Sequence, residues 1–88
     1  MTPLVRMIHA IATALLHPGE LETVEESAQP GAVTEVEIRV RGKLAKGAVI
    51  GLAGETITAI RHLARRVGKV QKPAVHVKVE VKNREEPS

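Results

Sequence analysis

The sequence predicts a small α+β domain in which a three-stranded sheet has three helices packed on one face. Apolar residues recur at helical spacing in some segments and alternate with polar residues in others, in the order α-β-β-α-α-β. The chain has 88 residues and no cysteine, so well-patterned secondary structure, dimerisation or both must hold one domain together. Since the last strand must cross over two helices to reach the sheet, a parallel or mixed sheet is favoured.

The first half of the chain predicts one helix and two strands. Residues 4–16 place their apolar side chains on one helical stripe, and Pro18-Gly19 ends that helix. Residues 20–27 are predicted as a strand, although their alternation is imperfect. A cleaner alternation over residues 33–41 predicts a half-buried second strand.

The two middle helices are predicted on either side of a short glycine-containing loop. Residues 43–50 predict a short helix with Leu44, Val49 and Ile50 facing the core. Residues 55–67 predict a longer amphipathic helix that Gly68 caps.

The last strand has the strongest strand pattern in the chain. Residues 75–81 alternate valines with charged residues or histidine, after a Lys-Pro pair. Residues 83–88 are predicted as a charged, flexible tail, so a single domain spans residues 1–82. No long apolar run or signal-peptide layout is present, and we expect a soluble, cytoplasmic protein.

Charge is distributed very unevenly along the chain. Residues 1–38 contain Arg6 as their only base and six glutamates. Residues 39–72 contain only Glu55 as an acid and the nine bases Arg39, Arg41, Lys43, Lys46, Arg61, Arg65, Arg66, Lys69 and Lys72. A basic segment of this density favours a polyanionic partner over a merely solvated face. For Arg65 and Arg66 alone, an ordinary solvated helix face is the simpler interpretation.

The residue inventory argues against enzymatic chemistry. The chain contains no aspartate, and its only serines are Ser27 and Ser88, so a Ser-His-Asp relay is absent. The four histidines show no metal-ligand spacing, and we expect no metal, no cofactor and no catalytic residues. Because the chain also lacks aromatic residues, nucleic-acid bases would have to rest on aliphatic side chains.

The most informative motif is a Gly-x-x-Gly pair inside residues 49–61, V-I-G-L-A-G-E-T-I-T-A-I-R. Glycines at 51 and 54 allow a phosphodiester to approach the backbone closely, and the helix that follows points its N-terminal N–H groups at the loop. A tight helix–helix turn without a ligand is the alternative. A Walker loop is excluded because Gly54 is followed by Glu55-Thr56 rather than by lysine and serine or threonine.

The motif and the order of elements together resemble a type II KH domain, and specifically the small, single-domain bacterial KH RNA-binding proteins of the KhpA type. The resemblance covers the chain from Leu4 to Val81 and depends most on G-A-V-I-G-L-A-G-E-T-I-T-A-I-R. It implies single-stranded RNA binding, with the backbone of about four nucleotides held at the loop. The RNA-binding residues that it implies are Lys43, Lys46, Val49, Ile50, Gly51, Leu52, Ala53, Gly54, Ile57, Arg61, Ile38, Arg39 and Arg41.

The loop departs from the family pattern in one respect. Family members usually carry a base inside the loop and another just before it, where this chain has Leu52, Ala53 and Ala48. Fewer charge-assisted phosphate contacts predict weaker RNA affinity, or transfer of that role to Lys46 and the arginines. A KH-fold protein–protein module with weak or lost RNA affinity is therefore the alternative function.

The resemblance also implies a cellular role and partners. It implies a post-transcriptional regulator or RNA chaperone that forms a homodimer or pairs with a longer multidomain KH protein of the Jag type. The RNA target, the choice between RNA and single-stranded DNA, and the oligomeric state stay open at this point. No membrane partner is expected.

Overall fold

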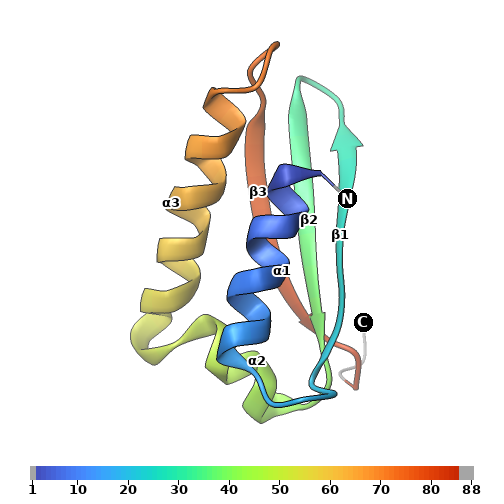
Figure 1. Ribbon diagram of the computed structural model, residues 1–88, viewed down its shortest axis with the longest axis vertical. Helices are drawn as coiled ribbons and strands as arrows, with labels where there is room; N and C mark the ends of the chain where they lie inside the picture. Colours follow the sequence, from blue (N-terminus) through green and yellow to red (C-terminus); the bar gives the residue numbers. More distant parts are fainter. Residues whose placement is uncertain (1, 86–88) are drawn as a thin grey trace.

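A computed structural model describes residues 2–85 of the chain (Figure 1). Its helices and strands, in chain order, are α1 (Pro3–Leu15), β1 (Leu21–Gln29), β2 (Val33–Val40), α2 (Lys43–Ile50), α3 (Glu55–Lys69) and β3 (His76–Asn83). A short 3₁₀ turn, Leu52–Gly54, separates α2 from α3. The structure therefore confirms a small α+β fold with a three-stranded sheet.

The sheet is mixed, which is one of the two arrangements that the predicted crossover favoured. The strands are ordered β1-β2-β3; β1 pairs with β2 in antiparallel orientation, and β2 pairs with β3 in parallel orientation. The register brings Glu25, Glu37 and Glu80 into one row across the sheet. Side chains alternate between the two faces of a strand, so this row lies on the face opposite the buried valines and isoleucines.

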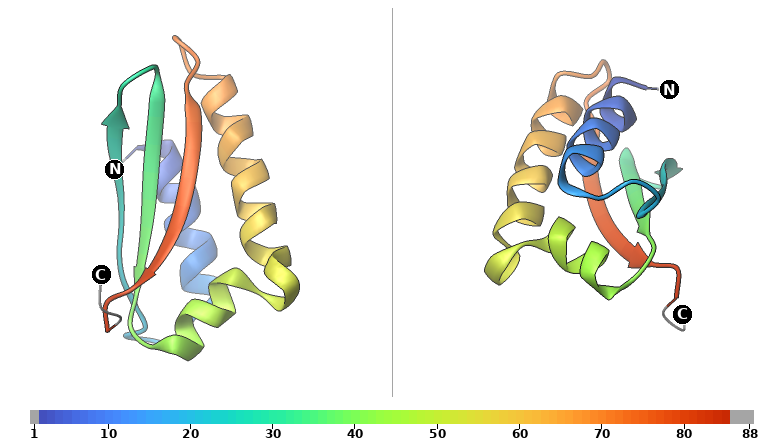
Figure 2. Two further views of the ribbon diagram at one scale, coloured as in Figure 1. Left: turned by 180° about the vertical axis from the view of Figure 1, so that it is seen from behind. Right: turned by 60° about the horizontal axis from the view of Figure 1, so that its bottom comes forward.

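Two long helices, α1 and α3, lie along the same face of the sheet, whereas the short α2 lies at one end of it (Figures 1 and 2). The prediction of three helices on one face is therefore wrong for α2. Eight helical residues span only about 12 Å, too little to run back along strands of about 26 Å. The longer α3 makes that return, which allows β3 to start at the far end and run parallel to β2.

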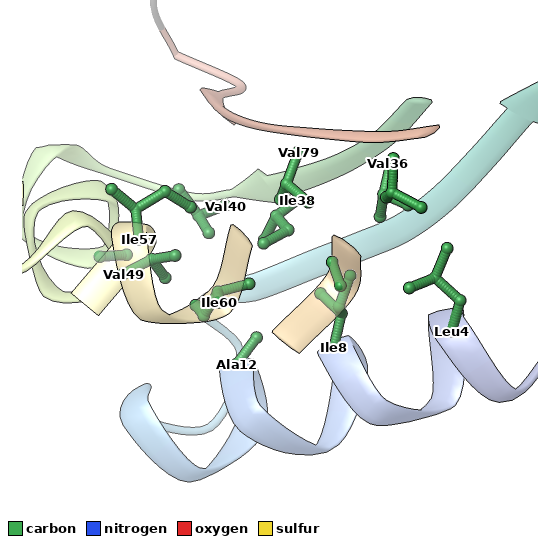
Figure 3. Close-up of a cluster of buried hydrophobic side chains, with 13 residues drawn as sticks. Leu4, Ile8, Ala12, Val36, Ile38, Val40, Val49, Ile57, Ile60 and Val79 are labelled. Carbon is green, nitrogen blue, oxygen red and sulfur yellow. The ribbon is translucent and has the colours of Figure 1, made fainter. Parts of the chain in front are cut away.

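The hydrophobic core lies between the sheet and the two long helices. In Figure 3, side chains from α1, α3 and the sheet point toward one another, and Ile8, Ile38 and Ile60 are almost completely buried. In α2 the core-facing side chains are Ala45 and Val49 rather than Leu44, which the sequence had predicted to face inward. No helix among residues 2–85 is both long and apolar enough to cross a membrane.

Two predicted boundaries at the C-terminal end are wrong. Helix α3 continues through Gly68, where an added Cβ would lie 2.5 Å from the carbonyl oxygen of Val75, so this glycine allows close packing rather than capping the helix. Strand β3 extends to Asn83, whose buried side-chain oxygen accepts hydrogen bonds from the backbone N–H groups of Gly42 and Glu85. The predicted tail thus cannot begin at Asn83, and its residues 86–88 lie outside the described part of the chain.

Candidate nucleic-acid interface

The loop between α2 and α3 turns through three residues with positive φ. These are Gly51 (φ 79°), Ala53 (φ 54°) and Gly54 (φ 74°). An added Cβ at Gly51 would lie 2.9 Å from the backbone nitrogen of Thr56 and closer still to its hydroxyl, whereas an added Cβ at Gly54 would meet nothing within 4 Å. Gly51 is therefore needed for both conformation and space, and Gly54 for conformation alone.

The tip of the loop presents uncharged side chains to solvent. Leu52 is 88% exposed, and Ala53 is exposed as well. Leu44, at the start of α2, is 89% exposed. Because neither loop residue carries a charge, attraction to an anion here depends on backbone N–H groups and on neighbouring bases.

Helix α3 starts directly after the loop, with Gly54 as its N-cap and no side chain capping its first N–H groups. The backbone N–H of Glu55 bonds to the carbonyl of Leu52, which closes the 3₁₀ turn. The positive end of the helix dipole therefore faces the loop, where it favours an anion. The carboxylate of Glu55, in the first turn of α3, offsets part of this field.

The predicted bases nearest in sequence to the loop lie on the two helices that flank it. Lys43 is exposed on α2, Lys46 is half-buried on the same helix, and Arg61 is half-buried on α3. The Nε–H of Arg61 donates a hydrogen bond to the backbone carbonyl of Val79, with 3.1 Å between nitrogen and oxygen. Arg61 thus ties α3 to β3 as well as contributing charge.

Arg39 and Arg41, which the resemblance also implied as RNA contacts, lie elsewhere. Arg39 lies on the open face of the sheet, where its guanidinium donates to Glu37 at 2.7 and 3.1 Å. Hydrogen bonds from Lys82 and Arg39 lower the pKa of Glu37 below its usual value. Arg41 is exposed just beyond β2, and its backbone N–H donates to the carbonyl of Glu20. The structure therefore does not gather these two arginines with Arg61.

Four of the RNA-binding residues that the resemblance implied, Ile38, Val49, Ile50 and Ile57, would form an apolar floor under the bases, but most of them are inside the core. Ile38 and Val49 are fully buried and Ile57 is 5% exposed, so these side chains belong to the core rather than to an accessible surface (Figure 3). Ile50, at the end of α2, is half-buried. Of these four floor residues, Ile50 is the one that reaches the surface.

Two bases of α3 lie beside β3, and one of them, Arg65, fitted an ordinary solvated helix face in the sequence. Arg65 and Lys69 of α3, together with Val75, His76 and Val77, line a pocket of about 270 Å³. Arg65 and Lys69 follow Arg61 by four and eight residues, so a helix places these three bases on one side. This spacing is the signal in the sequence for the group.

Comparisons with protein-family models and with curated proteins give no match for this chain. Among residues 2–85, no group of three histidine, cysteine, aspartate or glutamate side chains is placed to hold a metal ion. What the geometry offers chemically is anion binding by an uncapped helix N-terminus, a glycine-containing loop and basic side chains on α2 and α3.

Proposed function

We propose that this chain is a single-stranded RNA-binding protein of the type II KH kind, without enzymatic activity. The observation that carries the proposal is the backbone of Gly51 and Gly54: both have positive φ, and they join two helices of the basic part of the chain. Such a loop allows a phosphodiester to come close to backbone N–H groups at the positive end of α3.

The charges around the loop support the same proposal. Lys43, Lys46 and Arg61 flank the loop on α2 and α3, and they attract phosphates without specifying sequence. Since the loop itself is uncharged, the salt dependence of the affinity should reflect only the few phosphate contacts that these flanking bases make. In a cell this activity suits a post-transcriptional regulator or RNA chaperone, acting as a homodimer or with a multidomain KH protein of the Jag type.

The test replaces the two residues between the glycines and leaves the glycines in place. Leu52→Asp with Ala53→Asp puts two negative charges where the phosphate is expected, and both positions are exposed. The matched control is Leu52→Asn with Ala53→Asn, which has nearly the same shape without charge; asparagine and aspartate also tolerate the positive φ of Ala53. Affinity for labelled oligouridylate is measured at low and moderate salt, with the matching DNA strand alongside.

We expect the aspartate variant to bind at least about tenfold more weakly than wild type, equivalent to about 1.4 kcal/mol. The asparagine variant should stay within about threefold of wild type, since surface changes of this kind perturb little. Absence of wild-type binding at low salt would show the proposal to be wrong. Equal binding by all three proteins would mean that only bulk charge acts and that the loop is not the site.

A protein–protein module is the second candidate, and two exposed leucines favour it. Leu44 and Leu52 are 89% and 88% exposed, at the start of α2 and in the loop that follows it. Single exposed apolar side chains are common, but two this exposed near the same end of the fold suit a protein contact. The absence of RNA binding by wild type would support this candidate. Sedimentation should then show self-association of wild type that the double change Leu44→Gln with Leu52→Gln abolishes.

A further inference from the structure

Strand β1 is an open edge of the sheet. The strand order is β1-β2-β3, so within residues 2–85 β1 has a hydrogen-bonded neighbour on one side only (Figures 1 and 2). It is nine residues long, whereas strands of globular proteins most often have about five or six. Along such an edge every second residue points its backbone N–H and C=O groups away from the sheet, where they are available to a further strand.

A pocket of about 340 Å³ lies beside β1, on the side of the sheet that carries the helices. Its largely apolar walls include Pro3 and Leu4 at the start of α1, Val67 near the end of α3, and Val75 before β3. Glu26 of β1 also lines this pocket, and no other described residue that lines it is acidic. An apolar cavity with a few charged groups is the usual form of a binding site.

Two neighbouring carboxylates of β1, those of Glu25 and Glu26, point to opposite faces of the sheet. Side chains alternate along a strand, and the register pairs Glu26 with the buried Val36. Glu26 is therefore on the helix side, where it is half-buried, and Glu25 is exposed on the open face. Within residues 2–85 neither carboxylate takes part in an ion pair, so each can receive a basic group from a partner.

We infer that β1 binds an extended, basic segment of a partner protein, which adds to the sheet as a fourth strand and places an arginine or lysine side chain in the pocket beside Glu26. Backbone hydrogen bonds to the edge supply affinity, and the pocket selects the side chain. The aliphatic stem of that side chain packs against Pro3 and Leu4 while its charged end meets Glu26. This contact does not involve the Gly-x-x-Gly loop and does not depend on RNA binding.

The charges of β1 also specify the sequence of the segment. One base lies opposite Glu26 on the helix side and another opposite Glu25 on the open face, so the two bases are adjacent in the segment. A second copy of this chain does not fit, because full antiparallel pairing of β1 with itself puts Glu25 opposite Glu25. Moreover, the only adjacent bases of the chain, Arg65 and Arg66, lie in α3.

The test titrates a capped peptide, Thr-Val-Thr-Arg-Arg-Val-Thr, into wild type and three variants at low salt. Glu26→Gln should weaken binding by about tenfold, since it removes the acid of the pocket. Glu80→Gln removes an equal charge from the exposed face of the other edge strand and should change affinity by less than about twofold. Lys72 is exposed and also lines the pocket, so Lys72→Gln should leave binding unchanged or tighten it by up to about threefold.

A second measurement tests the strand pairing itself. Two further peptides of the same sequence carry N-methyl groups on alternate residues, one on each set of backbone nitrogens. The peptide whose methylated nitrogens face β1 should lose binding by more than about tenfold, and the other should stay within about threefold of the parent. Amide protons on the free edge of β1 should also exchange more slowly when the parent peptide is bound.

Four outcomes would overturn the inference. Absence of binding by wild type at low salt would show that β1 does not receive such a segment. Equal losses with Glu26→Gln and Glu80→Gln, or equal binding of the two methylated peptides, would mean that only general charge attraction acts. Weaker binding with Lys72→Gln would show that the pocket does not select a cation. None of these outcomes bears on RNA binding at the loop.

Discussion

Basic side chains on the sheet and basic side chains on α3 are in contrasting surroundings. On the sheet, Arg39 and Lys82 lie 2.7 and 3.0 Å from the two carboxylate oxygens of Glu37, and directly after β3 Arg84 lies 3.2 Å from Glu22. On α3, Arg65, Arg66 and Lys69 take part in no ion pair with residues 2–85.

The paired bases of the sheet stabilise the fold, whereas the bases of α3 favour a binding partner. The row of glutamates across the sheet places like charges beside each other, which is unfavourable unless bases balance them. Lys82 and Arg39 balance the charge of Glu37, although exposed pairs of this kind stabilise a fold only slightly. Within residues 2–85, Arg65, Arg66 and Lys69 have no such partner, and an unbalanced positive field of this kind favours a polyanion.

The largest expected effect comes from reversing charge in the two regions. Arg65→Glu with Lys69→Glu should weaken binding of a ten-nucleotide RNA by about tenfold to a hundredfold, since two attractive contacts become repulsive. Arg39→Glu with Lys82→Glu makes the same change of charge on the sheet and should alter affinity by less than about threefold. Fluorescence anisotropy at low salt measures both. A comparable loss of affinity in the sheet variant would mean that the open face of the sheet also contacts RNA, so the two regions would not differ.

The next effect concerns Gly68, which sets the spacing between α3 and β3. Gly68→Ala forces a Cβ against the Val75 backbone and should lower the free energy of unfolding by about 1–3 kcal/mol. Gly47→Ala, in the middle of α2 where an added Cβ meets nothing within 4 Å, should raise it by about 0.4–1 kcal/mol. Urea denaturation distinguishes the two, and a neutral Gly68→Ala would show that helix and strand are not closely packed there.

The smallest effect is the pH dependence of the sheet charges. Because the folded-state pKa of Glu37 is lowered by Lys82 and Arg39, the unfolded chain takes up this proton first as pH falls. The stabilisation is present above the ordinary glutamate pKa of about 4.3 and is lost as pH falls through the lower folded value. Glu37→Gln and Lys82→Gln should both reduce the loss of Tm between about pH 5 and pH 3. An unchanged acid profile in both variants would contradict the pairing.

Much of the fold follows from local patterns in the chain. Alternating valines predicted β2 and β3, and the stripe of Ile57, Ile60 and Ala64 predicted α3. The glycine spacing placed the loop correctly between α2 and α3. These patterns are readable because a strand repeats every two residues and a helix every 3.6, whatever surrounds them.

The wrong predictions concern residues whose contacts come from distant parts of the chain. Leu44 fits a helical stripe with Val49, yet α2 lies at the end of the sheet and buries Ala45 with Val49, whereas Leu44 is exposed. Asn83 begins a polar, charged stretch that is typical of a tail, yet its side chain accepts a hydrogen bond from the backbone of Gly42, forty-one residues earlier. Gly68 has the position of a helix cap, yet it is required by the contact with β3.

For the candidate site, the sequence alone was enough to locate the glycine loop and the basic segment and to show the lack of aromatic side chains, since these depend on residue type and spacing. Tertiary packing determined which basic side chains lie close to one another. Arg39 lies on the open face beside Glu37, and Ile38 and Ile57 are buried in the core. Arg65 and Lys69 line one pocket with His76. The reason is that the face on which a side chain emerges depends on how helices and strands from different parts of the chain meet in space.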